Sequence, residues 1–436
     1  MGWVKADALR GWGARAPAGA LLLLVLGVAA ALLAAATSPA LQAAGDRPRF
    51  SEPLLLSDPS HAIGEPAIAT GPGEEIYVVW GARPAGCSSN IYFTRSTDGG
   101  ESFSVARNLS EIPCESILES SEQPGVAVDP AGDIYVVWRH NGPGGPPPNQ
   151  VYFARSTDRG VTFTEPRNIS NSPPITPSPG ALAPDLAVGA PAHVCVAWSD
   201  RYDLEQLDQI FVSCSTDGGD SFSSPVQVSF RPEGWSGSSF PGVAVVPAGP
   251  MFVGWHQARP GAVDVFLSRS VDGGTSFSTP LDLSEGLFFS QQPKLAVDAE
   301  GTIYVVWHTL QVTSWETMFR RSVDGGLTFS PMKRITRRRH GSSIAQGIAV
   351  GRPGHVCVAW TEFGKDSDIF ARCSFDSGET FRKRFNASGR LGWEQGDVAA
   401  DPGGNVHVVF GGDLRSINPD AWWTGVYFRR SLEPLP

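Results

Sequence analysis

The sequence has almost no helix signal beyond its first 45 residues, and it has no excess of basic residues. No long apolar stretch with a 3.6-residue period follows residue 45, whereas Gly (49) and Pro (36) are abundant among the 436 residues. Lys and Arg number 34 against 44 Asp and Glu, a formal net charge of −10. The first absence excludes a helical bundle. The second argues against general nucleic-acid binding, which needs a basic face.

Cysteine and metal-ligand motifs are also scarce. The chain has only six cysteines, and none stands in a CxxC motif or in a Cys/His cluster with the spacing of a zinc site. We therefore expect neither a metal nor a cofactor.

What the chain does contain is one short motif written six times. Residues 96–103 read S-x-D-x-G-x-[ST]-F, and the copies are 52 to 60 residues apart. Such a period indicates a repeat fold. An Asp carboxylate can accept hydrogen bonds from the N–H groups just ahead of it, and the Gly suits a positive φ. We therefore interpret the six Asp residues as turn-formers rather than catalytic or metal-binding groups. The other five copies are residues 156–163, 215–222, 270–277, 322–329 and 374–381.

Each motif lies in a longer unit of four short strands. In the second unit, an apolar strand (125–128) and a turn lead to a strand that ends in Trp (134–138). A third strand (151–156) precedes the motif, and a fourth (163–170) follows it. Short β-branched and aromatic runs between Gly/Pro turns are strand signals, and four antiparallel strands per unit predict the blade of a β-propeller.

The number of blades follows from the Trp-ending strand, which occurs seven times, the last with Phe. The seventh unit stops before its fourth strand, and residues 50–57 resemble the fourth strand at 277–284. We expect this N-terminal strand to complete the last blade and close the ring, which removes exposed sheet edges. The prediction is an all-β, seven-bladed propeller over residues 46–436, with six blades as the alternative. The second strands end at Trp80, Trp138, Trp198, Trp255, Trp307, Trp360 and Phe410.

The first 45 residues have a different composition. Lys5, Arg10 and Arg15 precede an apolar run at residues 18–36 and a short stretch of small residues. This pattern is typical of a signal peptide or of a signal-anchor helix, and it is excluded from the fold. We expect an extracytoplasmic propeller that is secreted, periplasmic or anchored in the membrane by this segment alone.

Two units carry cysteines where others carry Tyr and Arg. Cys195 lies three residues before Trp198, and Cys214 directly precedes the motif at 215–222. The sixth unit has Cys at both equivalent positions. Positions that change together within one chain are expected to be cross-strand neighbours, and an even cysteine count fits an exported protein. The remaining two cysteines lie in loops at one end of the first blade. The expected disulfides are Cys195–Cys214, Cys357–Cys373 and Cys87–Cys114.

Loops that follow each Trp, and loops between blades, lie on the face opposite the repeated motif. They vary in length and chemistry, as functional loops do. Converging Arg side chains can hold a carboxylate or sulfate, and exposed Trp rings can stack on sugars. A carboxylate pair, Asp200 and Glu362, is the candidate for glycosidic bond cleavage. The candidate ligand-binding residues are Arg83, Arg139, Arg201, Arg259, Trp235 and Trp393.

The channel side of the first strands also shows a recurring dipeptide. A Glu or Gln precedes Pro or Gly in five units, and such side chains can bind a ligand or satisfy neighbouring backbone groups. The dipeptides are Glu65-Pro66, Gln123-Pro124, Gln292-Pro293, Gln346-Gly347 and Gln395-Gly396.

The repeated motif resembles the Asp-box of sialidase-like β-propellers, and the resemblance extends from about residue 50 to residue 431. Sialidases of this kind hold the sialic-acid carboxylate with three arginines and use a Tyr nucleophile beside a Glu. Their R-I-P motif is absent from Arg47-Pro48-Arg49-Phe50, and their rings have six blades. Tyr202, close to Glu205, is the exposed Tyr with a nearby Glu, although its place in the chain differs.

The resemblance leaves two hypotheses for function. One is a non-catalytic recognition module, monomeric, that binds a glycan or a surface protein and no nucleic acid. The other is an exo-sialidase or another glycoside hydrolase. The missing R-I-P motif and the uniform blades favour recognition.

Overall fold

The computed structural model describes residues 49–116, 119–142, 149–173, 180–201, 207–230, 232–286, 289–336, 342–364, 367–389, 392–413 and 424–434. The predicted leader, residues 1–45, lies outside them. No helix in the described part is long and apolar enough to cross a membrane.

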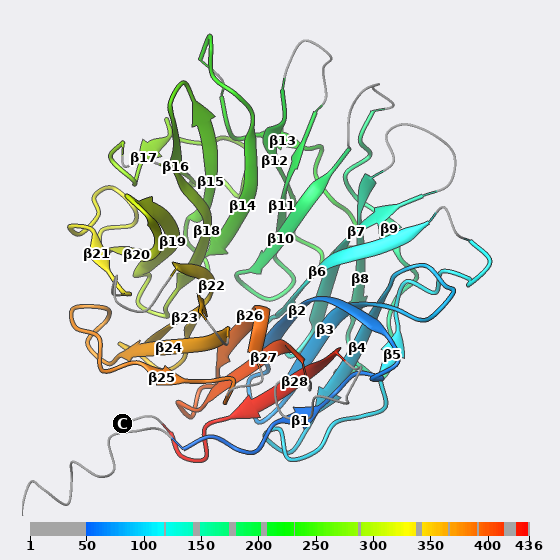
Figure 1. The fold of residues 1–436 in the computed structure, drawn as a ribbon. Helices are drawn as coiled ribbons and strands as arrows, with labels where there is room; N and C mark the ends of the chain where they lie inside the picture. Colours follow the sequence, from blue (N-terminus) through cyan, green and yellow to red (C-terminus); the bar gives the residue numbers. More distant parts are fainter. Residues whose placement is uncertain are drawn as a thin grey trace, which may run out of the picture. The chain divides into compact units, whose positions relative to one another are not determined.

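The described residues form seven antiparallel sheets of four strands, so the seven-bladed prediction is confirmed and the six-bladed alternative is wrong. The blades stand around a central axis with the first strand of each innermost (Figure 1).

Blade 1 is β2 (Ala62–Thr70), β3 (Ile76–Arg83), β4 (Asn90–Ser96) and β5 (Arg107–Asn108). Blade 2 is β6 (Ser120–Val128), β7 (Ile134–Asn141), β8 (Asn149–Ser156) and β9 (Arg167–Asn168). Blade 3 is β10 (Leu182–Val188), β11 (Val194–Asp200), β12 (Gln209–Ser215) and β13 (Val226–Gln227). Blade 4 is β14 (Ser238–Val245), β15 (Met251–Arg259), β16 (Ala262–Ser270) and β17 (Leu281–Asp282). Blade 5 is β18 (Ser290–Val297), β19 (Ile303–Gln311), β20 (Ser314–Ser322) and β21 (Lys333–Arg334). Blade 6 is β22 (Ser342–Val350), β23 (Val356–Phe363), β24 (Asp368–Ser374) and β25 (Phe385–Asn386). Blade 7 is β26 (Gly392–Ala400), β27 (Val406–Asp413), β28 (Thr424–Arg430) and β1 (Leu54–Leu55).

The hydrophobic core lies between neighbouring blades. Tyr77 and Phe93 of blade 1 pack with Ile134 and Trp138 of blade 2 in one cluster, and similar clusters join other neighbouring blades. The Trp side chains of the second strands are all fully buried. Each sheet is therefore covered on both faces by its neighbours, which explains why the second strands read as continuous apolar runs.

The second strands are longer than predicted. Each continues two to four residues beyond its Trp or Phe. The hairpin to the third strand keeps its backbone hydrogen bonds past the buried core. Five candidate site residues that the sequence placed in loops therefore stand on strands: Arg83, Arg139, Asp200, Arg259 and Glu362.

The Asp-box forms a tight turn, as predicted. In blade 1, Asp98 Oδ1 accepts hydrogen bonds from the N–H groups of Glu101 and Ser102, both at 3.0 Å. Ser102 Oγ donates to Asp98 Oδ2, and these bonds hold the pKa of Asp98 well below its ordinary value. Gly100 has a φ of 86°, and a Cβ there would lie 2.5 Å from the Phe428 ring of the preceding blade. Only Gly fits, because the box packs on its neighbour.

Five blades hold the next blade with an arginine of the third strand. Arg155 of blade 2 donates to the carbonyl of Gly218 in the box of blade 3, at 2.7 Å. The same position in the box accepts in every case. We call blades 1, 2, 4, 5 and 7 the Arg-type blades. The five donor and acceptor pairs are Arg95 with Arg159, Arg155 with Gly218, Arg269 with Gly325, Arg321 with Ser377, and Arg430 with Gly99.

Blades 3 and 6 have a disulfide at this position, and we call them the Cys-type blades. Cys195 lies directly opposite Cys214 in the β11–β12 ladder, and Cys357 lies opposite Cys373. All three predicted disulfides are present, the third being Cys87–Cys114.

The first and last blades pack together around the axis. Ile68 and Trp80 of blade 1 share a core cluster with Val409 and Phe428 of blade 7. In blade 7, β1 runs antiparallel to β28, with Leu54 opposite Phe428.

Candidate functional site

The first strand of each blade carries an irregularity at the same place, in its N-terminal half. The register with the second strand shifts there in all seven blades. Four residues at this place have left-handed backbones, with φ of 54° at Gln123, 49° at Ala183, 52° at Phe240 and 51° at Gln292. A β-bulge of this kind bends the strand and redirects a side chain, and non-Gly residues rarely adopt such a φ. We call the residue at this place the mouth residue of its blade.

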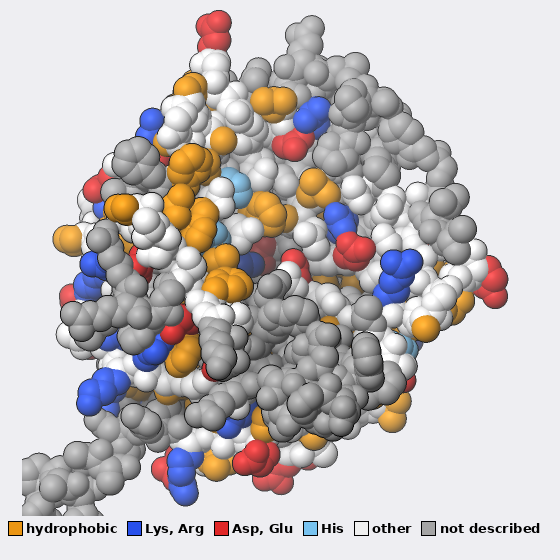
Figure 2. All heavy atoms as spheres, in the orientation of Figure 1, with side chains coloured by type: hydrophobic (Ala, Val, Ile, Leu, Met, Phe, Trp, Pro, Cys, Tyr) orange, Lys and Arg blue, Asp and Glu red, His pale blue; other side chains and the backbone are white. Residues whose placement is uncertain are grey.

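The mouth residues surround one cavity at the centre of the ring, with a volume of about 570 Å³. Figure 2 shows the hollow, with acidic and basic side chains inside it. The register corrects one sequence assignment: in blade 6 the mouth residue is Ala345, and Gln346 stands where most other blades have Pro. The seven mouth residues are Glu65, Gln123, Ala183, Phe240, Gln292, Ala345 and Gln395.

Three charged side chains line the same cavity two residues further along their strands. They are Asp185 of blade 3, Lys294 of blade 5 and Asp397 of blade 7, while the other four blades have Ala or Gly there. Asp185 accepts a hydrogen bond from the N–H of Val243 at 2.9 Å, and Asp397 accepts one from Ile68 at 3.2 Å. Each carboxylate thus bonds the following blade.

Burial changes the acidity of both carboxyl groups. It raises the pKa of Asp397 to about 6 and also raises the pKa of Asp185, while Lys294 opposes both shifts. A carboxyl group that titrates near neutral pH in a cavity is a candidate for proton transfer.

An aromatic pair forms the blade 4 side of the mouth. Phe240 is 40% exposed, and its ring stacks on His256 with a centroid distance of 5.5 Å. The N–H of Gln292 donates to His256 Nδ1 at 3.3 Å, and burial lowers the pKa of His256 to about 4. The imidazole is therefore neutral at neutral pH and holds the Phe ring beside the cavity.

A smaller cavity of about 310 Å³ opens beside the channel, between blades 1 and 2. Arg83 and Glu122 line it together with mouth residues. Gln395 Nε2 donates to Glu65 Oε1 at 3.0 Å, which links blade 7 to blade 1 across the mouth. Of the four predicted ligand-binding arginines, Arg83 is the one that lines either cavity.

The other three arginines are engaged within their own blades. Arg139 forms an ion pair with Glu122, Arg201 with Asp208 and Arg259 with Asp264. Each pair joins residues of one hairpin, so the three guanidinium groups do not converge on one point through these contacts.

The predicted carboxylate pair lies on opposite parts of the ring, Asp200 on blade 3 and Glu362 on blade 6. Asp200 is buried and accepts hydrogen bonds from Ser172 Oγ and the N–H of Arg201, while burial raises its pKa. Glu362 forms an ion pair with Arg384. Both stand two residues after a buried Trp.

That position has a structural role in other blades. Gln257 and Thr309 occupy it in blades 4 and 5, where each accepts a hydrogen bond from the indole N–H of its own blade, at 3.4 and 2.9 Å. The catalytic roles of Asp200 and Glu362 stay predictions.

The remaining candidates are aromatic. Trp235 is half-buried rather than exposed, and it packs against the core between blades 3 and 4, with its ring 6.0 Å from Phe266. Tyr202 lies outside the described residues. Trp393 stands on β26, and its side chain lies outside them.

Sequence reasoning missed Phe240, Asp185, Lys294 and Asp397. A signal was present, because Ala183-Pro184 and Phe240-Pro241 repeat the Glu/Gln-Pro dipeptide with another first residue. Asp185 directly follows Ala183-Pro184, whereas Lys294 and Asp397 directly follow dipeptides that the sequence analysis had already named. Treating the dipeptide as a position rather than as a Glu/Gln motif would have found Phe240 and Asp185, and extending it by one residue would have found Lys294 and Asp397.

Comparison with known families fits this architecture. Residues 45–305 match the family model of the BNR repeat-like domain, which is more than half of the chain. The chain belongs to this family. The resemblance to sialidase-like propellers is thereby confirmed, and no curated protein matches the sequence.

Solved structures similar to this BNR-repeat propeller include several carbohydrate-active proteins. An α-L-arabinanase of Penicillium chrysogenum has 14% identity and a TM-score of 0.55, covering 76% of this chain and all of its own. A polysaccharide lyase of family PL25, an ulvan lyase, has 12% identity and a TM-score of 0.54, covering 86% and 95%. The Hadza microbial sialidase Hz136 has 15% identity and a TM-score of 0.50, covering 82% and 76%. At these identities the likeness shows the fold alone.

Proposed function

We propose that this BNR-repeat propeller is exported and binds a glycan at the mouth of its central channel. The observation that carries the proposal is the repeated bulge, which sets seven mouth residues around one cavity. The mouth combines Glu and Gln side chains with the exposed ring of Phe240. A few placed polar groups beside an aromatic ring suit a sugar, which has polar hydroxyls and an apolar face.

Export is supported by two independent features. The first 45 residues have the pattern of a signal peptide or signal-anchor. The three disulfides are typical of proteins that fold outside the cytoplasm. We propose a monomer that is secreted, periplasmic or held at the membrane through the N-terminal segment alone, with a surface protein as the alternative ligand.

The ion pairs of the predicted ligand-binding arginines support recognition rather than sialidase chemistry. Three of the four predicted ligand-binding arginines already pair with an acidic side chain of their own blade. Releasing one to hold a sialic-acid carboxylate would leave its partner charge without a counter-ion.

Binding to a glycan array with the purified protein tests this proposal. Phe240→Ala and Gln123→Ala are each expected to weaken binding about tenfold, roughly 1.4 kcal/mol. Phe230→Ala and Gln227→Ala are the matched controls, because both side chains are exposed and neither lines the channel. Equal losses in the control variants, or no glycan bound at all, would contradict binding at the mouth.

A glycoside hydrolase is the second candidate, favoured by the acidity of Asp397. A carboxyl group with a pKa of about 6 can donate a proton to a leaving group at neutral pH. Turnover on a fluorogenic glycoside panel that includes a sialoside tests this candidate. If Asp397 is the general acid, activity should fall as the pH rises through about 6, and Asp397→Asn should abolish it.

The same panel tests the residues predicted from sequence. Release from the sialoside that is lost in Arg139→Ala or Arg201→Ala would support an exo-sialidase, and loss in Asp200→Asn or Glu362→Gln would support the predicted carboxylate pair. No release from any substrate would leave recognition as the function.

A further inference from the structure

The two Cys-type blades share a third residue besides their cysteines. Residues 193–198 and 355–360 have the identical sequence H-V-C-V-A-W. His193 and His355 therefore stand two residues before Cys195 and Cys357. At this position the Arg-type blades have Glu, Asp, Pro, Thr and Asn. Within the chain, His occurs there only where the disulfide occurs, so the three residues change as a set.

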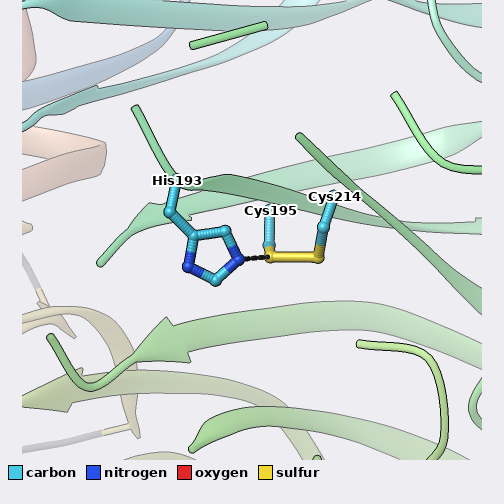
Figure 3. Close-up of side chains that lie close together, drawn as sticks. All are labelled: His193, Cys195 and Cys214. Atoms are coloured by element: carbon cyan, nitrogen blue, oxygen red, sulfur yellow. Dashed lines mark hydrogen bonds between the residues drawn. A yellow bond between two sulfur atoms is a disulfide. The ribbon is translucent and has the colours of Figure 1, made fainter. Parts of the chain in front are cut away.

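The structure brings these residues together. His193 Nε2 lies 3.5 Å from Cys195 Sγ (Figure 3), and His355 Nε2 lies 3.2 Å from Cys357 Sγ. In each blade the imidazole nitrogen and both sulfurs lie within 4.8 Å of one another. The cross-strand register makes the cluster, because it sets the second cysteine directly opposite the first. Spacing along the chain, which shows no zinc motif, could not reveal it.

We propose that each Cys-type blade is a latent Cys₂His site for a soft d¹⁰ metal ion, which forms when the disulfide is reduced. Zinc binds Cys sulfur at about 2.3 Å and His nitrogen at about 2.0–2.1 Å in a tetrahedral arrangement. The donor atoms of such an ion lie roughly 3.5–3.8 Å apart, close to the nitrogen–sulfur separations already present. Breaking the S–S bond permits the two sulfurs to move apart, and the second sulfur already lies within 4.8 Å of the imidazole nitrogen.

The chemistry balances with a phosphine as the reductant. The phosphine gives two electrons to the S–S bond and takes the oxygen of one water, which leaves a phosphine oxide and two thiols. A divalent ion that binds both sulfurs then releases the two thiol protons. The resulting unit of one dication and two thiolates is neutral, which suits a site where Cys195, Cys357 and His355 are buried.

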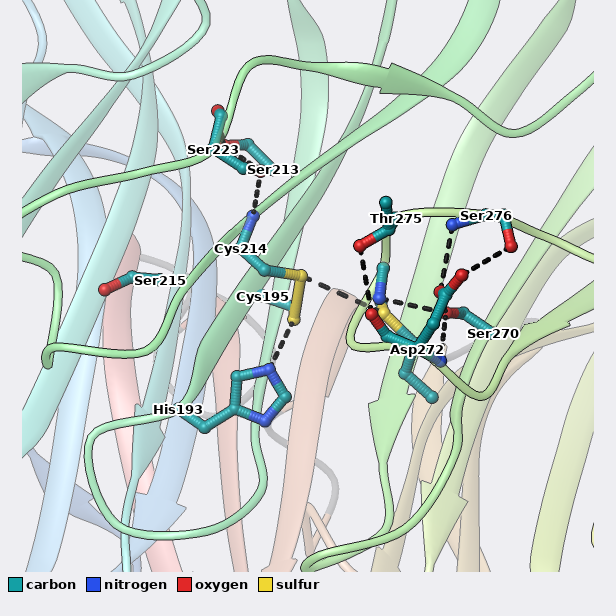
Figure 4. Close-up of a disulfide and its surroundings, with 12 residues drawn as sticks. His193, Cys195, Ser213, Cys214, Ser215, Ser223, Ser270, Asp272, Thr275 and Ser276 are labelled. Atoms are coloured by element: carbon teal, nitrogen blue, oxygen red, sulfur yellow. Dashed lines mark hydrogen bonds between the residues drawn. A yellow bond between two sulfur atoms is a disulfide. The ribbon is translucent and has the colours of Figure 1, made fainter.

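Blade 3 offers a fourth donor atom, a thioether sulfur. Met251 of the next blade has its sulfur 3.9 Å from Cys214 Sγ, and both sulfurs lie against Gly274 of the Asp-box. Figure 4 shows this turn around Asp272. The equivalent residue beyond blade 6 is Val406. Thiolate and thioether ligands favour soft ions, so the blade 3 site should bind such an ion more tightly than the blade 6 site.

The test uses the full chain reduced with a water-soluble phosphine, with six free thiols verified by alkylation and mass spectrometry. Cd²⁺ is the probe, because its thiolate complexes absorb in the ultraviolet. Two ions per reduced chain are expected and none per oxidised chain. His193→Ala and His355→Ala should each weaken one site at least roughly tenfold to a hundredfold. Met251→Leu should weaken only the blade 3 site, and His61→Ala, whose ring lies against Tyr92, is the matched control.

The third disulfide is an internal control. Cys87 and Cys114 belong to no such cluster among the described residues, so Cys87→Ser/Cys114→Ser should leave the stoichiometry at two. Binding that persists unchanged in both His variants, or that disappears in Cys87→Ser/Cys114→Ser, would overturn the proposal. If the reduced chain is unfolded, refolding upon addition of two equivalents of Cd²⁺ would support it, and failure to refold would overturn it.

Discussion

In five blades of this propeller an arginine of the third strand donates a hydrogen bond to the next blade, whereas two blades carry a disulfide at the same position, with a histidine beside it. In an Arg-type blade the guanidinium crosses to the next box and donates to a backbone carbonyl, as Arg155 does to Gly218. In a Cys-type blade the cross-link lies within one sheet. Equivalent positions in one ring thus carry either a polar contact between two blades or a covalent bond within one blade.

The neighbours of the two Cys-type blades differ. Blade 7 has no Asp-box, so an arginine at Cys373 would find no box carbonyl. Blade 4 has one, and the position that an arginine contacts in other blades is Gly273, where an added Cβ would meet nothing within 4 Å. At the corresponding Gly218 a Cβ would meet Arg155 at 2.4 Å.

The side chain that contacts the second Gly of the next blade's Asp-box also differs between Arg-type and Cys-type blades. A Cβ at box Gly219 would meet Phe153, whereas at Gly274 it would meet Cys214 Sγ at 2.9 Å. The residue of blade 3 equivalent to Phe153 is the smaller Val212. The disulfide therefore fills space that an aromatic ring fills elsewhere, and the exchange involves packing as well as cross-linking.

The largest effect is expected from removing β1, the outermost strand of blade 7, the Arg-type blade whose sheet combines both ends of the described chain. Deleting residues 49–57 removes the β1–β28 ladder and the bond from the Leu56 N–H to the carbonyl of Val426. It also exposes the edge of β28, which invites aggregation. We expect a loss of more than about 4 kcal/mol, measured by chemical denaturation. Deleting residues 1–45 alone is the control, and equal stability of the two truncations would show that β1 does not close the ring.

The disulfides come next. Replacing the Cys195–Cys214 or Cys357–Cys373 pair by serines should each cost about 3–5 kcal/mol, because packing is lost with the cross-link. Cys87–Cys114 closes the longest of the three loops, with a sequence separation of 27 against 19 and 16, but Cys114 is exposed. If packing dominates, the Cys87→Ser/Cys114→Ser variant is the least destabilised. If loop entropy alone acts, thermal melts will rank it as the most destabilised.

An Arg-type contact should contribute less than a disulfide. Arg155→Ala removes hydrogen bonds to the carbonyls of Asp217 and Gly218, and we expect a loss of about 1–2 kcal/mol in urea denaturation. Arg83→Ala is the control, since within the described part of the chain this exposed side chain bonds a carbonyl of its own blade, and its loss should stay within about 0.5 kcal/mol. If Arg155→Ala is as stable as the control, the arginine contact does not stabilise the packing of neighbouring blades.

The smallest effect separates the two Cys-type blades. Cys195→Tyr/Cys214→Arg should recover about 1 kcal/mol relative to the double serine variant, because Gly273 is exposed at the box position that the arginines contact in other blades. The same exchange at Cys357 and Cys373 should recover nothing, since blade 7 offers no box. Equal recovery in both blades, compared by thermal unfolding, would mean that the added aromatic ring rather than the Arg bond stabilises the blade.

Much of the fold could be predicted because the repeat encodes it locally. The Asp-box uses hydrogen bonds that span only a few residues, so the pattern alone predicts its turn. Two of the three disulfides could be predicted because two positions change together, and the third because the remaining cysteines lie in loops at one end of the first blade. Strand ends could not: Arg139 and Asp200 looked like loop residues, and only hairpin hydrogen bonds beyond the Trp place them on strands.

The candidate site shows the same division. The sequence by itself determined the blade, the number of blades and the cysteine pairs, because each follows from contacts within one repeat or between identical repeats. Only the tertiary structure decided which side chains meet at the axis. Asp185, Lys294 and Asp397 come from three different blades and share one cavity because the blades stand around one axis. A local sequence pattern cannot predict contacts between residues roughly a hundred positions apart. The paired arginines also show that a polar residue predicted to bind a ligand can instead form an ion pair within its own blade.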